Sequence, residues 1–264
     1  MARQEPRPPF FSGSAGASSS LFQVKKRQST SVTQTAPITP ASTEERARQS
    51  LGSSSQPIYE MVRRLVAARI DREHPIKLLD VGCGTGNLHD FVDKLVDQYE
   101  GVDVLQYETY PSHLPFHKID LDSGRADLPD AYADFVVAVE TIEHLENPRA
   151  FMRELVRLCR PGGWVIVTTP NQLSLLSKLT LLVKNQFNAF TETNYPAHIT
   201  ALLEIDLRRM AAECKLVETQ IGYSHSGRIP GVSIGWPKLL SRFLAKSFSD
   251  NLSITGRKGQ SGVV

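Results

Sequence analysis

Three glycines at alternate positions form the stretch of this sequence that is best suited to hold a ligand. Gly82, Gly84 and Gly86 directly follow the apolar run 76–81, in which Asp80 is the acidic residue. Glycine lets a ligand approach the backbone closely because it has no Cβ atom. The free N–H groups at the start of a following helix favour a polar or anionic group. The stretch therefore predicts a ligand-binding loop, and the alternative is an ordinary tight turn.

Asp103 is a second residue with a predicted binding role. It lies near the end of the short segment 99–104, 23 residues beyond Asp80. A carboxylate at the end of the second strand of such a unit can accept hydrogen bonds from both hydroxyls of a ribose. Glu100 is the competing residue, but it precedes the end of the strand. We therefore expect Asp103 to contact a ribose.

Alternating strand and helix patterns must position these residues. Strands are predicted where apolar residues run together, over 76–81, 99–104, 115–121, 133–140, 164–169, 216–223 and 251–257. Helices are predicted where apolar residues recur with a helical period, over 58–70, 88–96, 148–159, 173–183 and 203–214. Such alternation predicts an α/β protein with a mostly parallel sheet and a ligand at the C-terminal ends of the first strands.

The composition limits the partners and the location of the protein. A net charge of +2 argues against broad nucleic-acid binding. No apolar run reaches the roughly 18 residues of a membrane span. Cys83, Cys159 and Cys214 have no metal-ligand spacing and are expected to be reduced thiols of a cytoplasmic protein. The alternative is an organelle-targeted protein, because the N-terminal segment is Ser-rich and carries Lys25-Lys26-Arg27.

Several segments lie outside the regular pattern. Residues 1–52 lack core-forming residues and predict a disordered tail before a domain over 53–257. Residues 172–199 predict a lid-like insertion, and 258–264 are expected to fray. The segment 236–248 has an apolar helical face and basic residues on another. Its favoured interpretation is packing on the sheet as part of the lid, and the alternative is peripheral contact with a membrane surface.

The glycine loop is similar to motif I of the class I S-adenosylmethionine (SAM)-dependent methyltransferases, which reads acidic-x-Gly-x-Gly-x-Gly. A dinucleotide fingerprint would place its third glycine one residue later, where this chain has Asn87. The run from Glu140 to Asn171 resembles the branch that includes ubiquinone-biosynthesis O-methyltransferases, with E-x-x-E-H, a helix, P-G-G, a strand and T-P-N in order. The resemblance covers about 55–257. It implies a Rossmann-like, seven-stranded, mostly parallel sheet with an antiparallel last strand and helices on both faces.

This resemblance implies SAM as the cofactor and gives roles to individual residues. The glycine loop would back the amino-acid part of SAM, and Asp103 would bind the ribose. Asp120 and the backbone N–H that follows it would contact the adenine, with Asp122 as the alternative carboxylate. The expected cofactor-binding residues are Asp80, Gly82, Cys83, Gly84, Gly86, Asp103, Asp120, Leu121 and Glu140.

The resemblance also implies the reaction, which is transfer of the SAM methyl group to a small-molecule acceptor, most readily a hydroxyl oxygen. Positioning of the nucleophile supplies most of the rate, and a hydroxyl acceptor also needs a general base. His144 is the candidate base because the pKa of histidine lies near neutrality, and the alternative is a structural histidine. The competing functions are an NAD-dependent oxidoreductase and a SAM-binding scaffold without activity.

Glu140-x-x-Glu143-His144 matches a pattern that binds a divalent metal in some relatives, among them small-RNA 2′-O-methyltransferases. A downstream histidine completes the site in those RNA enzymes, and His198 is the counterpart here. Two carboxylates and two imidazoles would suit Mg²⁺ or Mn²⁺. The alternative is a loop without a metal, in which these side chains only fix the chain over the cofactor. RNA is not expected as the acceptor, because the net charge is near neutral.

Overall fold

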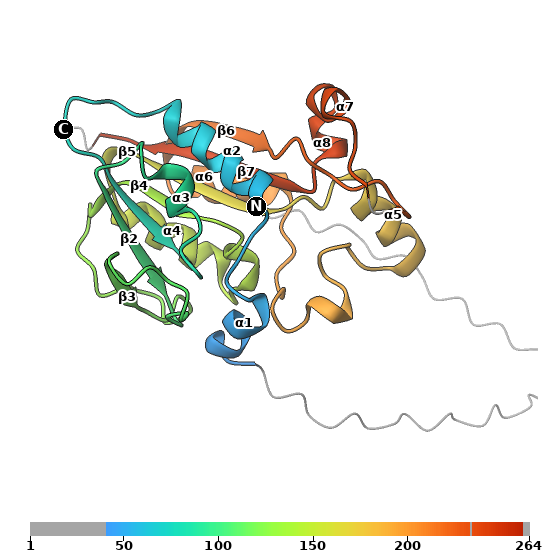
Figure 1. Ribbon diagram of the computed structural model, residues 1–264, viewed down its shortest axis with the longest axis horizontal. Helices are drawn as coiled ribbons and strands as arrows, with labels where there is room; N and C mark the ends of the chain where they lie inside the picture. The colour runs from blue at the N-terminus through green and yellow to red at the C-terminus, as the bar shows by residue number, and fades with distance from the viewer. Residues whose placement is uncertain (1–40, 233, 261–264) are drawn as a thin grey trace, which may run out of the picture. The chain divides into compact units, whose positions relative to one another are not determined.

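The computed structural model describes residues 41–232 and 234–260, and the remaining residues lie outside the description. A seven-stranded sheet with the order β3-β2-β1-β4-β5-β7-β6 forms the centre of the domain (Figure 1). Its first five strands are parallel, and β7 is antiparallel to both β5 and β6. The strands are β1 (Lys77–Val81), β2 (Gln98–Asp103), β3 (Phe116–Lys118), β4 (Ala133–Ala138), β5 (Cys159–Pro170), β6 (Leu216–Tyr223) and β7 (Asn251–Lys258). The predicted fold class is confirmed.

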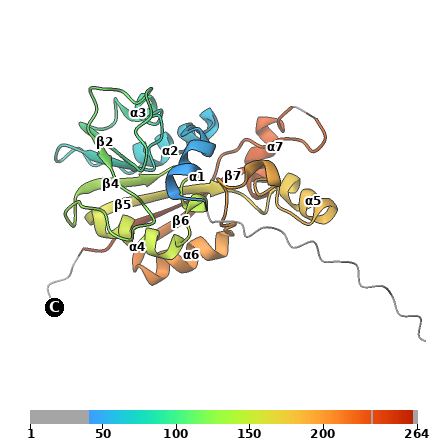
Figure 2. The ribbon, with the colours of Figure 1, turned by 90° about the horizontal axis from the view of Figure 1, so that it is seen from below.

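Helices cover both faces of this sheet, because its central strands are apolar on both sides. Figure 2 shows α2 (Gln56–Ala67) and α3 (His89–Val92) on one face, and α4 (Pro148–Leu158) and α6 (Glu204–Glu213) on the other. Each face has its own buried cluster of apolar side chains. The strand order reverses between β1 and β4, so the C-terminal ends of these strands border a crevice in which ligands can bind.

Two predicted elements are shorter in the structure. The helix expected over 88–96 is only the single turn α3, because the chain must return to β1 to start β2. The N–H groups of Asp97 and Gln98 donate to the Ile76 carbonyl, and the Asp97 carboxylate accepts from the Ile76 N–H. The strand expected over 115–121 pairs only at β3.

Ordered structure extends beyond the predicted domain boundaries, by a helix at the start of the described chain and by one residue at its end. Residues Thr43–Ser50, expected in the tail, form helix α1, with a capping box between Ser42 and Glu45. Lys258, expected to fray, is the last residue of β7, and its Nζ donates to the Cys159 carbonyl at 2.8 Å. Residues 1–40, with the basic cluster at 25–27, and residues 261–264 lie outside the described part of the chain.

The lid-like insertion contains α5 (Leu175–Lys184) and the short helix η2 (Glu192–Asn194). The helical segment expected over 236–248 is divided into α7 (Lys238–Phe243) and α8 (Ala245–Phe248). Within the described ranges, no helix has both the length and the apolar character needed to cross a membrane.

Candidate active site

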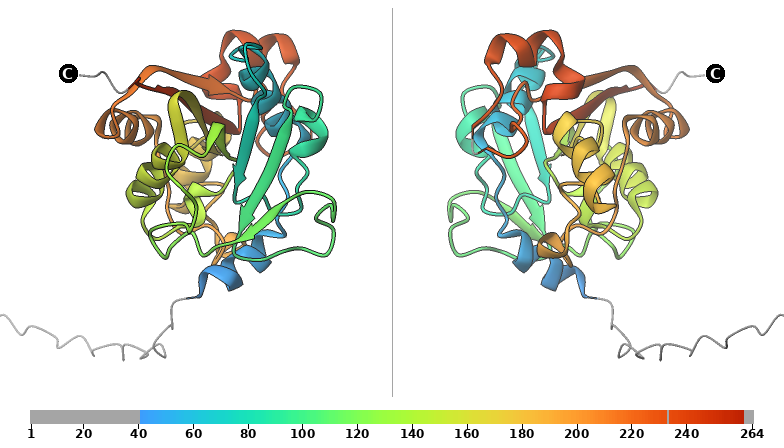
Figure 3. Two further views of the ribbon diagram at one scale, coloured as in Figure 1. Left: turned by 90° about the vertical axis from the view of Figure 1, so that its left-hand side faces the viewer. Right: turned by 90° about the vertical axis from the view of Figure 1, so that its right-hand side faces the viewer.

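A cavity of about 870 Å³ lies at the C-terminal ends of the first strands, beneath α1 and the insertion. Figures 1 and 3 show α1 and the segment around η2 side by side at this end of the sheet. The cavity brings together most of the predicted site residues, although they come from four strands and the insertion. Those in its lining are Asp80, Gly82, Cys83, Gly84, Asp103, Leu121, Glu140, His144 and His198.

The glycine loop has the left-handed backbone that its sequence predicts. Gly82 has φ 79°, and a Cβ there would lie 2.3 Å from the Thr141 hydroxyl oxygen, so no larger residue fits. The Gly84 N–H donates to Asp103 Oδ2 at 2.9 Å, which fixes the loop to the end of β2. A Cβ on Gly84 would lie 2.1 Å from the Gly52 carbonyl oxygen. A side chain at position 84 would therefore collide with Gly52 before it could reach the ligand space.

Asp80 presents one free carboxylate oxygen at the floor of the cavity. Its Oδ2 accepts a hydrogen bond of 2.6 Å from the Tyr99 hydroxyl, whereas its buried Oδ1 has no partner among the described residues. Burial raises the pKa of Asp80 to about 7, against the effect of the Tyr99 hydrogen bond. Burial also raises the pKa of Asp103 above its usual range. A cation placed here would favour the ionised form of both carboxylates.

Gly86 and Asp120 were predicted to bind the cofactor, and the structure places both outside the cavity lining. A Cβ on Gly86 would lie 2.9 Å from Pro111, so this glycine is needed for packing. Asp120 is exposed, and its carboxylate accepts from the Asp122 N–H at 3.0 Å. The alternative carboxylate, Asp122, instead forms an ion pair with Arg46 of α1.

Helix α1 is a part of the site that the sequence pattern did not reveal. Thr43, Arg46, Ala47 and Ser50 line the cavity, and Arg46 is buried. The Arg46 guanidinium contacts Asp122 and, at 3.5 Å, Glu146. This helix carries mostly polar residues, so it lacks the apolar period that predicts a packed helix.

We expect removal of residues 1–52 to weaken SAM binding, because it deletes α1 and the Gly52 carbonyl that accepts from the Thr85 N–H at 2.8 Å. Removal of residues 1–40 alone should leave affinity and melting temperature unchanged, since this deletion keeps α1. Calorimetric titration of both truncated proteins with SAM measures the difference. Equal affinities would show that α1 contributes nothing and would support the boundary at residue 53.

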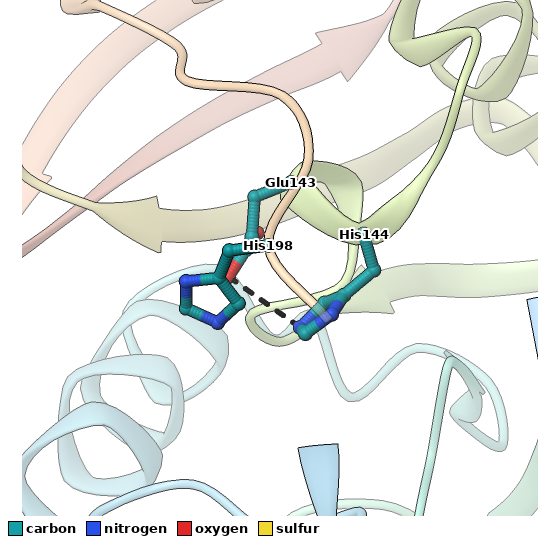
Figure 4. A group of neighbouring side chains, drawn as sticks. All are labelled: Glu143, His144 and His198. Carbon is teal, nitrogen blue, oxygen red and sulfur yellow. Dashed lines mark ion pairs between the residues drawn. The ribbon is translucent and has the colours of Figure 1, made fainter. Parts of the chain in front are cut away.

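Glu143, His144 and His198 form a compact cluster beside the cavity (Figure 4). One ligand atom from each lies within 4.8 Å of the others, and His144 Nε2 is 3.9 Å from Glu143 Oε1. Glu143 is fully buried, and neither of its carboxylate oxygens has a hydrogen-bond partner in the described chain. Burial, together with the charge of Glu140, raises the pKa of Glu143 well above its usual range. An unpartnered buried carboxylate requires a cation, a proton or water.

Backbone carbonyls fix the orientation of both imidazoles. His144 Nδ1 is 2.8 Å from the Ala197 carbonyl, and His198 Nδ1 is 2.7 Å from the Ala189 carbonyl. A carbonyl can only accept, so each Nδ1 carries the proton and each Nε2 retains a lone pair. Burial, aided by neighbouring His198, lowers the pKa of His144 to about 4, so this ring is neutral at physiological pH. A carbonyl at the second ring nitrogen is the usual arrangement around a metal-binding histidine.

Glu140, the fourth metal candidate, lies apart from this cluster. Its Oε1 accepts from the Thr168 hydroxyl at 2.8 Å and its Oε2 from the Asn251 amide at 2.6 Å. Both oxygens are therefore engaged with β5 and β7. The expected set of two carboxylates and two imidazoles is reduced to one carboxylate and two imidazoles. This donor set favours Mn²⁺, Fe²⁺ or Zn²⁺ over Mg²⁺, which prefers an all-oxygen site.

Comparison with known proteins gives one family. Residues 55–213, more than half of the chain, match the family model described as "Methyltransferase domain". The ubiquinone biosynthesis O-methyltransferase of Albidiferax ferrireducens is 31% identical over 106 residues, 36% of this chain and 42% of the relative. Its namesake from Chromobacterium violaceum is 32% identical over 132 residues, 46% and 56% of the two chains. A SAM dependent methyltransferase structure from Archaeoglobus fulgidus has a TM-score of 0.53 at 18% identity, covering 74% of this chain and 94% of the other.

The chain therefore belongs to the class I SAM-dependent methyltransferases, as its motifs predict, and SAM is the cofactor. The family match contains both the glycine loop and the E-x-x-E-H segment. The chain spans about half the length of the two curated relatives. The Archaeoglobus structure, at its low identity, supports the fold alone.

Proposed function

We propose that this protein transfers the methyl group of SAM to a hydroxyl oxygen of a small-molecule acceptor that is held beside Glu143, His144 and His198. The observation that carries the proposal is the cluster itself, in which a fully buried carboxylate, without a hydrogen-bond partner among the described residues, lies beside two imidazoles whose Nδ1 atoms are bound by backbone carbonyls. The cluster adjoins the cavity that contains the glycine loop. Such a group suits the binding and deprotonation of a hydroxyl.

SAM would occupy the part of the cavity between the glycine loop and α2. The sulfonium of SAM supplies the methyl group, so the protein mainly has to align the acceptor. Asp103 would accept hydrogen bonds from the ribose, and the free Oδ1 of Asp80 would accept one from the SAM ammonium. Leu121, which lines the cavity beyond β3, would contact the adenine. Glu140 would contribute indirectly, since it fixes Asn251 at the cavity wall.

The residues of the cluster fit a divalent cation. Glu143 supplies one oxygen, and the Nδ1–H donation to Ala197 and Ala189 directs the lone pairs of both histidines away from the backbone. A divalent cation bound there would lower the pKa of the acceptor hydroxyl and would hold it in line with the methyl group. His144 would serve as a ligand in this arrangement. In its absence, neutral His144 Nε2 would be the general base.

The proposed function is tested by methyl transfer from isotopically labelled SAM to a panel of small catechols, phenols and aliphatic diols. Product is expected only with Mn²⁺, Fe²⁺ or Zn²⁺ present, and it should carry the label on oxygen. Transfer to none of these acceptors, with or without metal, would contradict the hydroxyl assignment. SAM binding without any turnover would favour the non-catalytic scaffold.

Glu143→Gln should stabilise the metal-free protein. The raised pKa of Glu143 means that its ionised form costs stability in the folded state. This cost is absent below the pKa of an unfolded glutamate, about 4.3, and it grows as the pH rises toward the folded-state pKa. At neutral pH the substitution should add roughly 1–3 kcal/mol. Melting curves with a chelator, at acidic and neutral pH, measure this; a gain that does not depend on pH would contradict the charge explanation.

A further inference from the structure

Helices α5 and α7 present an apolar surface that the proposed reaction does not use. Figures 1 and 2 both show these helices on the same side of the sheet, beyond β5 and β7. The apolar face expected to pack on the sheet is instead exposed, with 79% of Phe243 and 69% of Leu239 accessible. Leu182 of α5 is 80% accessible. The favoured expectation that this face packs as part of the lid is therefore wrong. The other exposed apolar residues of this docking surface are Leu179, Leu181, Val183, Val232, Ile234, Leu240 and Leu244.

The charge around this docking surface has one sign. Residues 172–191 and 219–249 contain no Asp or Glu, although they supply six Lys and Arg side chains. Arg228 and Lys246 pair with carboxylates from outside these two segments. The other four cationic side chains are those of Lys178, Lys184, Lys238 and Arg242, and all four are exposed. Within the described chain, none of them lies within ion-pair distance of a carboxylate. The positive charge of these two segments therefore comes from their lack of acidic residues, since Lys and Arg are about as frequent here as in the rest of the chain.

We infer that this docking surface binds the interface of an anionic lipid bilayer. Leu and Phe side chains can enter the acyl boundary while flanking Lys and Arg remain among the anionic headgroups. A second copy of this chain is a poorer occupant, since a two-fold contact would oppose cations to cations. The apolar residues also leave few hydrogen-bonding groups for a nucleic acid to contact.

The elements that carry the docking surface also contribute residues to the active-site cavity. Ser174 and Ser177, at the start of α5, line this cavity, as do Arg228 and Gly235 before α7. Docking would therefore hold the cavity mouth at the bilayer. The inference does not depend on the proposed chemistry, because it concerns only where the protein binds.

Co-sedimentation with phosphatidylcholine vesicles, with and without phosphatidylglycerol, tests the inference on the full chain. The wild type should sediment with the anionic vesicles at low salt and not with the neutral ones. Leu182→Ser combined with Phe243→Ser should lower the partition coefficient at least roughly tenfold. Lys238→Glu combined with Arg242→Glu should remove the preference for anionic lipid. SAM affinity, measured in parallel, should stay at the wild-type value and would show that each variant is folded.

Val217→Ser is the matched control, since Val217 is 47% accessible but pairs with Arg257 at the start of β6, away from the docking surface. It should sediment like the wild type. Wild-type protein that stays in the supernatant with anionic vesicles would overturn the inference. So would a solution dimer, detected by light scattering, that dissociates when Phe243 is replaced, because the surface would then bind a second copy.

Discussion

Replacing His198 by alanine should lower methyl transfer at least roughly a hundredfold, because even groups that merely orient metal ligands are worth about 10- to 100-fold in metal affinity. His198 provides one of the two imidazoles whose ligand atoms lie within 4.8 Å of a Glu143 carboxylate oxygen. Its removal leaves one imidazole and one carboxylate, too few to hold a divalent cation firmly. Turnover with saturating SAM, together with binding of Mn²⁺ measured by calorimetry, should show both losses.

Three comparisons make this result specific. SAM affinity should change little in His198→Ala, because the expected SAM contacts come from β1, β2 and the glycine loop. His113→Ala removes an exposed histidine outside the cavity lining and should behave as the wild type. Chelation of the wild type should abolish turnover, and added Mn²⁺ should restore it. Full activity in excess chelator would reject the metal site and would leave His144 as the base.

Asp103→Ala should weaken SAM binding tenfold or more. A buried hydrogen bond that involves a charged group contributes roughly 1.5–3 kcal/mol, and the expected ribose contact is of this kind. The substitution also removes the acceptor of the Gly84 N–H bond at 2.9 Å and the Leu105 N–H bond at 3.3 Å. The glycine loop would lose the hydrogen bond from Gly84 and keep those from Gly82 and Cys83 to the Val102 carbonyl, so the loss of affinity should exceed that of the ribose contact alone.

Asp120→Ala is the informative control for Asp103. The sequence motif gives Asp120 a role at the adenine, whereas the structure exposes it outside the cavity lining. Calorimetry should therefore find wild-type SAM affinity in this variant. A tenfold loss in Asp120→Ala would restore the motif-based role, and wild-type affinity in Asp103→Ala would show that the ribose lies elsewhere.

Local patterns in the sequence were sufficient to predict the sheet and the glycine loop. The short apolar run before Gly82 indicates a buried strand, and the alternate glycines indicate a tight loop that favours the left-handed backbone seen at Gly82, φ 79°. The start of α4 could also be predicted, because Asn147 is a favoured N-cap residue and Pro148 is a favoured first residue of a helix. These features depend on neighbours in the chain, so the sequence contains the information directly.

Tertiary structure alone decided which acidic residues serve the site. Glu140 and Glu143 look equivalent in E-x-x-E-H, but Asn251, far along the chain, engages Glu140 and leaves Glu143 free. Likewise, α1 has no apolar stripe, and Arg46 holds it through Asp122, 76 residues away. A hydrogen bond or ion pair between distant residues depends on how the strands and loops meet in space. The periodicity of apolar residues in one segment therefore cannot predict such a contact. For this reason the sequence alone predicted the sheet and the cofactor loop. Only the tertiary structure showed that Glu143, and not Glu140, joins the two histidines and that α1 covers the cavity.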